Sequence, residues 1–224
     1  MIVGLIPARG GSKGIPRKNL QRVNRKTLLE RGISLLFSGG CEEVYVSTED
    51  SEISNYALEF GAKVILRPNE LATDTAGTDS VLLHSATVLN LNLSDILVLH
   101  QLTSPLLESK SVKGCIEALR NAQLASSMSV RFAHPFMWSQ VDTDDWQPVG
   151  HTRDFRPRRQ ELGVQGIETG GCYAMRVGAL LEQKCRFPQP TLGIEVSFIE
   201  SLDIDTGEDL EIASMILEKI EENK

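Results

Sequence analysis

The sequence predicts an α/β protein with a Rossmann-like, doubly wound and mostly parallel sheet. Two observations lead to this fold class. Short runs of apolar, β-branched residues alternate along the chain with helical patterns, which is typical of parallel strands joined by crossover helices. The first of these runs leads directly into a glycine-rich loop, at the strand end where such sheets place their ligands. The 224 residues fit a single domain, 1–224, that contains one excursion.

The expected elements follow a regular order over the first 132 residues. Strands are expected at 2–7, 43–48, 63–66, 96–101 and 127–132. Helices are expected between them at 26–38, 51–60, 78–91 and 109–123. The helix at 78–91, for example, carries apolar residues on one side, and Asp79 near its start suits the helix dipole. Right-handed crossovers then predict that helices cover both faces of the sheet.

The regular order breaks after Phe132. Residues 133–166 contain Trp138, Trp146 and several turn-forming residues, and they show no clear period. A stretch of this length without elements of its own is usually functional or part of an interface. The alternation then resumes, with a strand expected at 171–177, a short helix at 178–184, a strand at 193–199 and a helix at 207–222.

Composition excludes several classes of protein. The formal net charge of -7 argues against nucleic acid as a partner, because binding to a phosphate backbone needs a broad basic surface. The sequence has no apolar run near the roughly 20 residues of a membrane span. The four cysteines form no C-x-x-C pair, so neither zinc nor a disulfide framework is indicated. The N-terminus has no signal-peptide layout, and we expect a cytoplasmic protein.

Residues 1–29 concentrate positive charge on this acidic chain, with seven lysines and arginines and no acidic residue. Within them, the loop from Ala8 to Gly14 holds three glycines, which allow backbone N–H groups to approach an anion. The Walker A and dinucleotide patterns both fail here on spacing. The loop therefore predicts a phosphate site of another kind, and the alternative is a surface turn with solvated basic residues.

Asp203 and Asp205 form a second candidate site near the C-terminus. Residues two apart in an extended backbone project to the same face, so both carboxylates can bind one cation. Mg²⁺ is commonly held by one or two carboxylates together with substrate phosphates. The alternative is that these acids only decorate the start of the following helix, as Asp209 and Thr206 are expected to do.

Residues 6–19 resemble the opening motif of the acylneuraminate (CMP-sialic acid) cytidylyltransferase family. Further segments resemble the motifs of the same family in the same order along the chain. These segments are 66–75, 101–106, 134–135, 159–160, 168–170 and 202–206.

The resemblance implies roles for individual residues. The nucleotide-binding positions carried over are Arg9, Ser12, Lys13, Lys18, Asn19, Arg67, Thr78 and Thr103. Those implied to hold the second substrate are Gln101, Thr169, Gly170 and Arg159, and the arginine would reach the active site of a neighbouring subunit. Asp203 and Asp205 would bind catalytic Mg²⁺, and Arg9 and Lys18 would share in catalysis.

The same resemblance implies a nucleotidyltransferase-type fold and a homodimer joined through the excursion at 133–166. The implied reaction combines CTP with a nonulosonic, sialic-acid-like sugar acid to give the CMP-sugar and pyrophosphate. Thr169, Ile167 and Met137 depart from residues common in the family, and all three are expected on the sugar side. Two alternatives stay open: a 3-deoxy-manno-octulosonate cytidylyltransferase, and a catalytically silent nucleotide-binding regulator.

Overall fold

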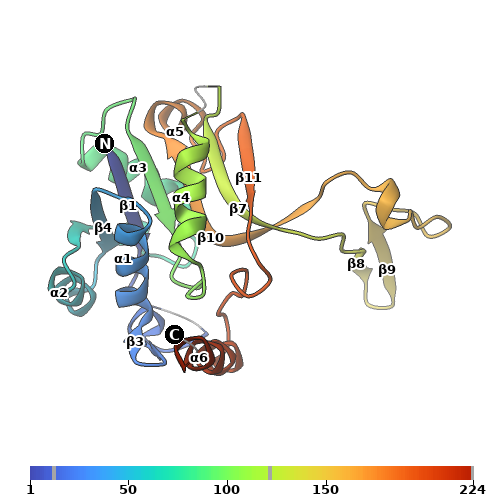
Figure 1. The fold of residues 1–224 in the computed structure, drawn as a ribbon, viewed down its shortest axis with the longest axis horizontal. Helices are drawn as coiled ribbons and strands as arrows, with labels where there is room; N and C mark the ends of the chain where they lie inside the picture. Colours follow the sequence, from blue (N-terminus) through green and yellow to red (C-terminus); the bar gives the residue numbers. More distant parts are fainter. Residues whose placement is uncertain (12–13, 121–122, 223–224) are drawn as a thin grey trace.

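The computed structural model describes residues 1–11, 14–120 and 123–222, and within them a seven-stranded sheet forms the centre of the molecule (Figure 1). The strands lie in the order β11-β7-β10-β6-β1-β4-β5. Their bounds are β1 Ile2–Pro7, β4 Glu43–Thr48, β5 Lys63–Leu66, β6 Ile96–His100, β7 Ser126–Phe132, β10 Gly166–Arg176 and β11 Thr191–Glu195. The predicted α/β class with a mostly parallel sheet is confirmed.

Within the seven-stranded sheet, the described strands pair in parallel except at β10. This strand runs antiparallel to both of its neighbours, β6 and β7, while β1 pairs in parallel with β4 and β6. Parallel strands leave their carboxyl ends on one edge of the sheet. The segments that follow β1, β4, β5 and β6 therefore gather at that edge, where sheets of this kind bind ligands.

Helices cover both faces of the sheet, as the alternation predicts. The core on one face is built with α1 Leu28–Ser38, α2 Ser51–Glu59, α4 Ser109–Ala118 and α6 Gly207–Glu222. The core on the other face is built with α3 Thr78–Val88 and α5 Val177–Gln183. β1 shows why both faces are buried, since Leu5 belongs to one core and Ile6 to the other.

Local capping explains where two of the helices begin. Thr27 accepts a hydrogen bond from the Glu30 N–H at 3.0 Å, so α1 starts at Leu28 rather than at residue 26. The two residues before α1 instead form β3 Lys26–Thr27, which pairs with β2 Arg22–Val23. Asp50 caps α2 in the same manner, with its carboxylate accepting from the N–H groups of Glu52 and Ile53.

Residues 133–166, which we call the arm, extend away from the sheet (Figure 1). The expectation that this segment has no elements of its own is wrong, because it contains β8 Met137–Asp142, β9 Asp145–Val149 and the short 3-10 helix η3 Arg159–Glu161. Every residue of β8 is exposed. With neither face buried, the hairpin has no need of alternating apolar and polar residues, and so no period reveals it.

Among the described residues, no helix is both long enough and apolar enough to cross a membrane.

Candidate functional site

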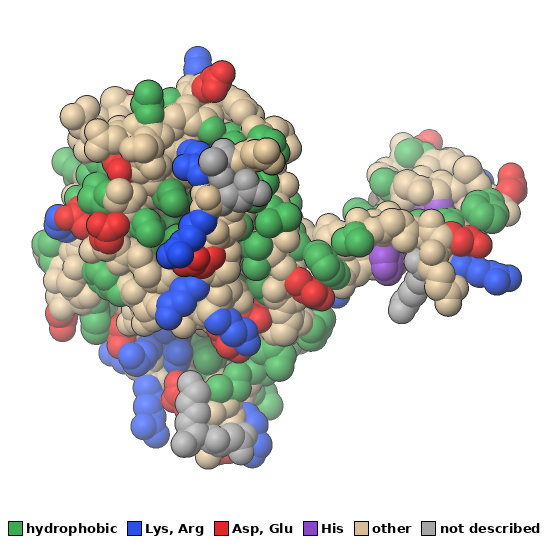
Figure 2. Space-filling view, turned by 45° about the horizontal axis from the view of Figure 1, so that its top comes forward, with side chains coloured by type: hydrophobic (Ala, Val, Ile, Leu, Met, Phe, Trp, Pro, Cys, Tyr) green, Lys and Arg blue, Asp and Glu red, His purple; other side chains and the backbone are tan. Residues whose placement is uncertain are grey.

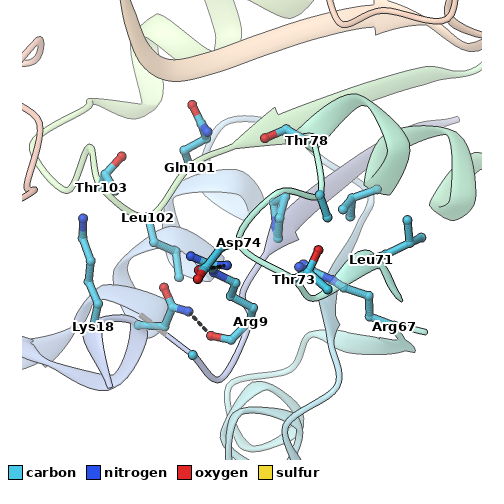
Figure 3. A pocket seen from close by; sticks show the side chains of 15 residues that line it. Arg9, Lys18, Arg67, Leu71, Thr73, Asp74, Thr78, Gln101, Leu102 and Thr103 are labelled. Atoms are coloured by element: carbon cyan, nitrogen blue, oxygen red, sulfur yellow. Dashed lines mark hydrogen bonds and ion pairs between the residues drawn. The ribbon is translucent and has the colours of Figure 1, made fainter. Parts of the chain in front are cut away.

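A cavity of about 330 Å³ lies at the carboxyl edge of the sheet (Figure 3). It is formed by the loops that follow β1, β5 and β6 and by the start of α3. Seven residues expected to bind nucleotide or sugar acid line it together: Arg9, Lys18, Asn19, Arg67, Thr78, Gln101 and Thr103. Residues up to 94 positions apart in the chain thus share one small cavity.

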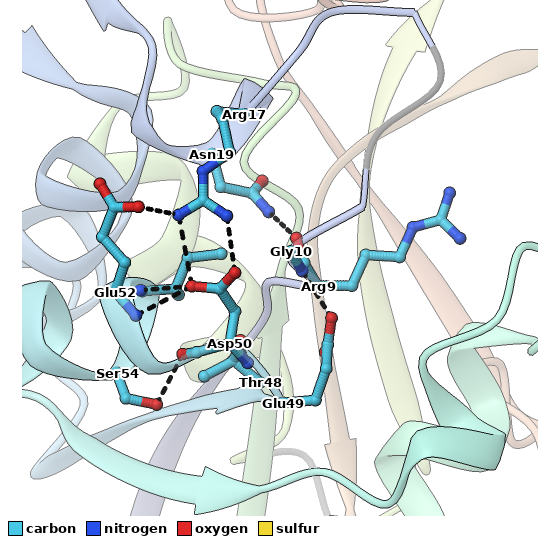
Figure 4. Close-up of polar contacts among 10 residues, drawn as sticks. Arg9, Gly10, Arg17, Asn19, Thr48, Glu49, Asp50, Glu52 and Ser54 are labelled. Atoms are coloured by element: carbon cyan, nitrogen blue, oxygen red, sulfur yellow. Dashed lines mark hydrogen bonds and ion pairs between the residues drawn. The ribbon is translucent and has the colours of Figure 1, made fainter.

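The glycine-rich loop is anchored to the end of β4 (Figure 4). The Gly10 N–H donates to Oε1 of Glu49 at 2.7 Å, and the Asn19 side chain donates to the Arg9 carbonyl at 2.9 Å. A Cβ atom on Gly10 would lie 2.5 Å from Oδ2 of Asp50, so this position needs glycine because of close packing. At Gly10, then, the backbone N–H meets a carboxylate of the protein rather than facing the cavity.

Arg17 locks the far side of this loop. Its guanidinium donates to both carboxylate oxygens of Asp50, at 2.6 and 3.3 Å, and also contacts Glu52. The hydrogen bonds from Arg17 hold the pKa of Asp50 below its usual value. Ser12 and Lys13, which belong to the predicted nucleotide set, lie outside the described residues.

Arg67 supplies a buried positive charge beside the cavity. Its side chain donates to the hydroxyl of Ser47 at 3.1 Å and to the Ser47 carbonyl at 2.6 Å. Burial lowers the pKa of this guanidinium, which nonetheless stays charged at neutral pH because an arginine starts from so high a value. Two bonds to β4 therefore aim a fixed cation at the cavity.

Asp203 and Asp205 lie next to the cavity, although they are not among the residues that line it. Between them, the buried Ile204 donates its N–H to the Thr103 carbonyl at 2.8 Å and so ties this segment to the loop after β6. Nζ of Lys18 lies 3.3 Å from Oδ1 of Asp205. A Cβ atom on Gly14 would lie 2.6 Å from the Asp205 carbonyl oxygen, so the glycine-rich loop touches the acidic segment directly.

The two carboxylates differ in their surroundings. Desolvation by the neighbouring loops raises the pKa of Asp203, the negative charge of Asp205 adds to that rise, and a hydrogen bond from Thr103 opposes it. Asp209 accepts hydrogen bonds from the backbone N–H groups of Asp205 and Thr206, at 3.1 and 2.8 Å. Thr206 and Asp209 therefore form the capping box at the start of α6, as the sequence predicts, and this cap does not use the carboxylates of Asp203 and Asp205.

Of the residues expected on the sugar side, Gly170 lies beside Gln101, whereas Met137 lies in β8 of the arm. Gly170 has a φ of 72°, and a Cβ atom there would lie 3.1 Å from Oε1 of Gln101. Thr169 is buried, and its hydroxyl lies 2.7 Å from the Ser129 hydroxyl and 3.1 Å from the Ser129 carbonyl. The Thr169 hydroxyl thus has partners within the protein, and its contact with a sugar acid stays a prediction.

Arg159 lies in η3 of the arm, and its side chain is outside the described part of the structure. The arm projects away from the central sheet of its own chain (Figure 1). The structure therefore does not bring Arg159 to the residues that gather at the sheet edge.

The structure adds residues that the sequence did not single out. Nη1 of Arg9 lies 2.7 Å from Oδ1 of Asp74, and both side chains face the cavity. Glu49 and Asp50, at the end of β4, hold the glycine-rich loop. Asp74 stands in one of the matched motifs, and Asp50 precedes a helical pattern as a capping residue does. No sequence pattern near Asp74, Glu49 or Asp50 predicts that these residues contact the glycine-rich loop.

Comparison with known proteins is consistent with this geometry. Residues 3–144 match the family model described as cytidylyltransferase. The chain is 31% identical over 217 residues to N-acylneuraminate cytidylyltransferase A of Danio rerio, an alignment covering 95% of this chain and 50% of that protein. It is 29% identical over 225 residues to CMP-N,N'-diacetyllegionaminic acid synthase of Legionella pneumophila, covering 97% of this chain and 96% of that one. The chain thus spans about half the length of some curated relatives and nearly all of others.

Solved structures share the fold. A CMP:2-keto-3-deoxy-manno-octonic acid synthetase complexed with CTP superposes with a TM-score of 0.72 at 19% identity, covering 98% of this chain and 99% of that one. A 4-diphosphocytidyl-2C-methyl-D-erythritol synthase gives a TM-score of 0.71 at 15% identity, covering 96% and 98% of the two chains. These likenesses show the fold alone. The match of residues 3–144 shows the family, and the chain belongs to the cytidylyltransferases.

Proposed function

We propose that this chain transfers the cytidylyl group of CTP to a nonulosonic, sialic-acid-like sugar acid, giving the CMP-sugar and pyrophosphate. The observation that carries the proposal is the cavity at the sheet edge, where Arg9, Lys18 and Arg67 converge on a chain of net charge -7. The relatives that this chain spans almost entirely support the class of acceptor. They are named CMP-N,N'-diacetyllegionaminic acid synthase and pseudaminic acid cytidylyltransferase.

The chain's own residues would act mainly by positioning and by neutralising charge, as in other phosphoryl transfers. The anomeric 2-hydroxyl of the sugar acid attacks the α-phosphorus of CTP. A new oxygen–phosphorus bond forms, the bond from the α-phosphorus to the bridging oxygen breaks, pyrophosphate leaves, and the hydroxyl proton is released. Arg9 and Lys18 would neutralise the triphosphate and the departing pyrophosphate, with Arg67 as a fixed charge beside them.

Asp203 and Asp205 are the residues that would hold Mg²⁺. Burial raises the pKa of Asp203, and the negative charge of Asp205 adds to that rise. This fits the role, because a cation between the two carboxylates would relieve their mutual repulsion. Among the described residues no third His, Cys, Asp or Glu joins them in a metal-binding group, and Mg²⁺ needs only one or two carboxylates with phosphate oxygens. When bound, the ion would stabilise the negative charge that develops on the phosphates.

The sugar acid would lie beside Gln101, with the backbone at Thr169 and Gly170 on its other side. We further propose a homodimer, in which Arg159 on the arm of one chain completes the site of the partner. The exposed apolar residues of the arm support an interface there, and a two-fold dimer is the commonest oligomer. We place the enzyme in the cytoplasm, where its substrate CTP is made.

Pyrophosphate release tests the reaction directly. Purified protein is incubated with CTP, Mg²⁺ and each member of a panel of nonulosonic and octulosonic acids. Release with nonulosonic acids, and its loss when Mg²⁺ is chelated, is the expected result. Release with octulosonic acids only would favour the octulosonate enzyme, and CTP binding without any release would favour the silent regulator; either result overturns the proposal.

A further inference from the structure

Carboxylates of the protein already form ion pairs with two of the cations that line the cavity in the described structure, Arg9 and Lys18. Nη1 of Arg9 lies 2.7 Å from Asp74, and Nζ of Lys18 lies 3.3 Å from Asp205. The Gly10 N–H donates to Glu49 at 2.7 Å. Figure 3 shows Asp74 beside Arg9 in the middle of the cavity, at the place where an entering anion would meet the guanidinium.

Glu49 and Asp74 differ in how far they are exposed to solvent. Glu49 follows directly on β4, and its second oxygen is buried and lacks a hydrogen-bond partner among the described residues. Asp74 instead lies in the segment between η2 Asn69–Leu71 and α3, and its side chain is 44% exposed. The Arg9 side chain is 30% exposed. An ion pair this open to water is weak, because solvent screens it.

We infer that Asp74 is an internal counterion of Arg9, which a phosphate group must displace in order to bind the guanidinium. The inference rests on the proposed function, since it takes the cavity to be the site of a triphosphate. A triphosphate carries several negative charges against the single charge of Asp74, so it wins the competition. Asp74 lowers the affinity for every anion that uses Arg9, and its return to Arg9 favours release of the pyrophosphate product.

Titration calorimetry with inorganic tripolyphosphate tests this inference without the base, the metal or the reaction. The variant is Asp74→Asn, which keeps the size of the side chain and removes its charge. Because an exposed ion pair contributes at most about 1 kcal/mol, we expect tripolyphosphate to bind about two- to fivefold more tightly at low salt. The difference should shrink as salt is raised, since salt screens the pair.

Glu70→Gln is the matched control. Glu70 lies in η2, four residues from Asp74, is exposed, and makes no contact with Arg9 in the described structure. Glu70→Gln removes the same charge from the same segment, so it measures how much any lost negative charge there strengthens tripolyphosphate binding. A double-mutant cycle with Arg9→Ala then measures the coupling of the pair, because the gain from Asp74→Asn should be smaller when Arg9 is absent.

The outcomes separate this inference from the proposed function. Unchanged or weaker binding by Asp74→Asn overturns the inference, as does an equal gain from Glu70→Gln or a gain that is undiminished in the Arg9→Ala background. Failure of the wild type and Asp74→Asn alike to bind tripolyphosphate also overturns it. Absence of pyrophosphate release with every sugar acid would overturn the proposed reaction, while the tripolyphosphate titration would still decide on Asp74.

Discussion

The body of the molecule and its arm both contain antiparallel strand pairs, but they differ in what they bury. β7 and β10 pair along their length and enter the arm together. Within the body, α4 and the neighbouring strands cover them, and Tyr173 and Cys172 are fully buried. Beyond Phe132 the chain loses that cover, and Trp138 and Trp146 are exposed. Figure 2 shows the arm set apart from the body, with apolar side chains on its surface.

The exposure of the arm indicates that backbone pairing alone contributes little to its stability. A two-stranded hairpin is marginal in water unless another surface covers an apolar face. Single exposed apolar residues such as Leu58 on the body are ordinary, whereas the arm carries several on a short segment. The body therefore buries most of its apolar residues in its own core, whereas the arm leaves several of its apolar residues exposed. Five experiments test this difference between the body and the arm, and they follow in order of decreasing expected effect.

The largest effect is expected at the acidic pair of the body. Asp205→Asn keeps the shape of the side chain and removes the charge that attracts a cation, so turnover should fall by about three orders of magnitude or more, a loss typical of an essential electrostatic group. CTP binding should remain measurable by calorimetry. A wild-type rate at saturating Mg²⁺ would show that the metal assignment is wrong.

Mixing two inactive variants tests whether the arm completes the site of a second body. Asp205→Asn and Arg159→Ala are allowed to exchange subunits before pyrophosphate release is measured. If Arg159 acts in trans, a heterodimer has one site with both lesions and one intact, and random exchange restores about a quarter of the wild-type activity. If Arg159 acts within its own chain, every site keeps one lesion and the mixture stays inactive.

Lys18→Ala measures how much a positive charge of the body contributes to CTP binding and to turnover. Loss of a charge-assisted hydrogen bond should cost roughly 1.5–3 kcal/mol, seen as lower kcat/KM and weaker CTP binding. Arg25→Ala is the control, because it removes an exposed positive charge from the same basic segment. Equal effects of the two variants would show that Lys18 acts only as a solvated basic residue of the surface.

Trp138→Ser tests the apolar surface of the arm. The Trp138 residue is 47% exposed in the single chain, and burial in a partner's surface would make it an interface anchor worth about 2 kcal/mol, or roughly 30-fold in the dimer dissociation constant. Leu58→Ser is the control on the body, where Leu58 is 57% exposed. Analytical ultracentrifugation of both variants decides; equal sedimentation behaviour at every concentration would contradict an interface on the arm.

The smallest effect is expected in the core of the body at low pH. Burial lowers the pKa of His100 to about 4, so between that value and about 6.5 the unfolded state takes up the proton more readily. The free energy of unfolding should therefore fall by roughly 1–2 kcal/mol between pH 7 and pH 5. Denaturant unfolding measures it, and His100→Asn should flatten that part of the pH dependence. The same slope in His100→Asn would assign it to other groups.

The strands of the body could be predicted because they pack against the core, and this burial requires apolar residues that are visible in the sequence. β1, β4 and β5 match the predicted ranges residue for residue, since each contains apolar, β-branched residues and their buried members pack into the cores on the two faces of the sheet. β10 begins five residues before the predicted strand, in a stretch with glycines and a register shift between Glu168 and Tyr173. β8 and β9 were missed, because every residue of β8 is exposed and none of β9 is fully buried, so no apolar face imposes a period on the sequence.

The sequence alone determined the α/β class, the order of most elements and the concentration of positive charge before residue 30. Those features depend on neighbours in the chain, whose periodicity and turn residues are visible locally. Only the tertiary structure decided that Asp74 meets Arg9, that Arg17 is held by Asp50, and that Gly14 packs against the backbone of Asp205. Each of these contacts joins loops from different strands, and their distances follow from the register and twist of the sheet, which no short segment encodes by itself.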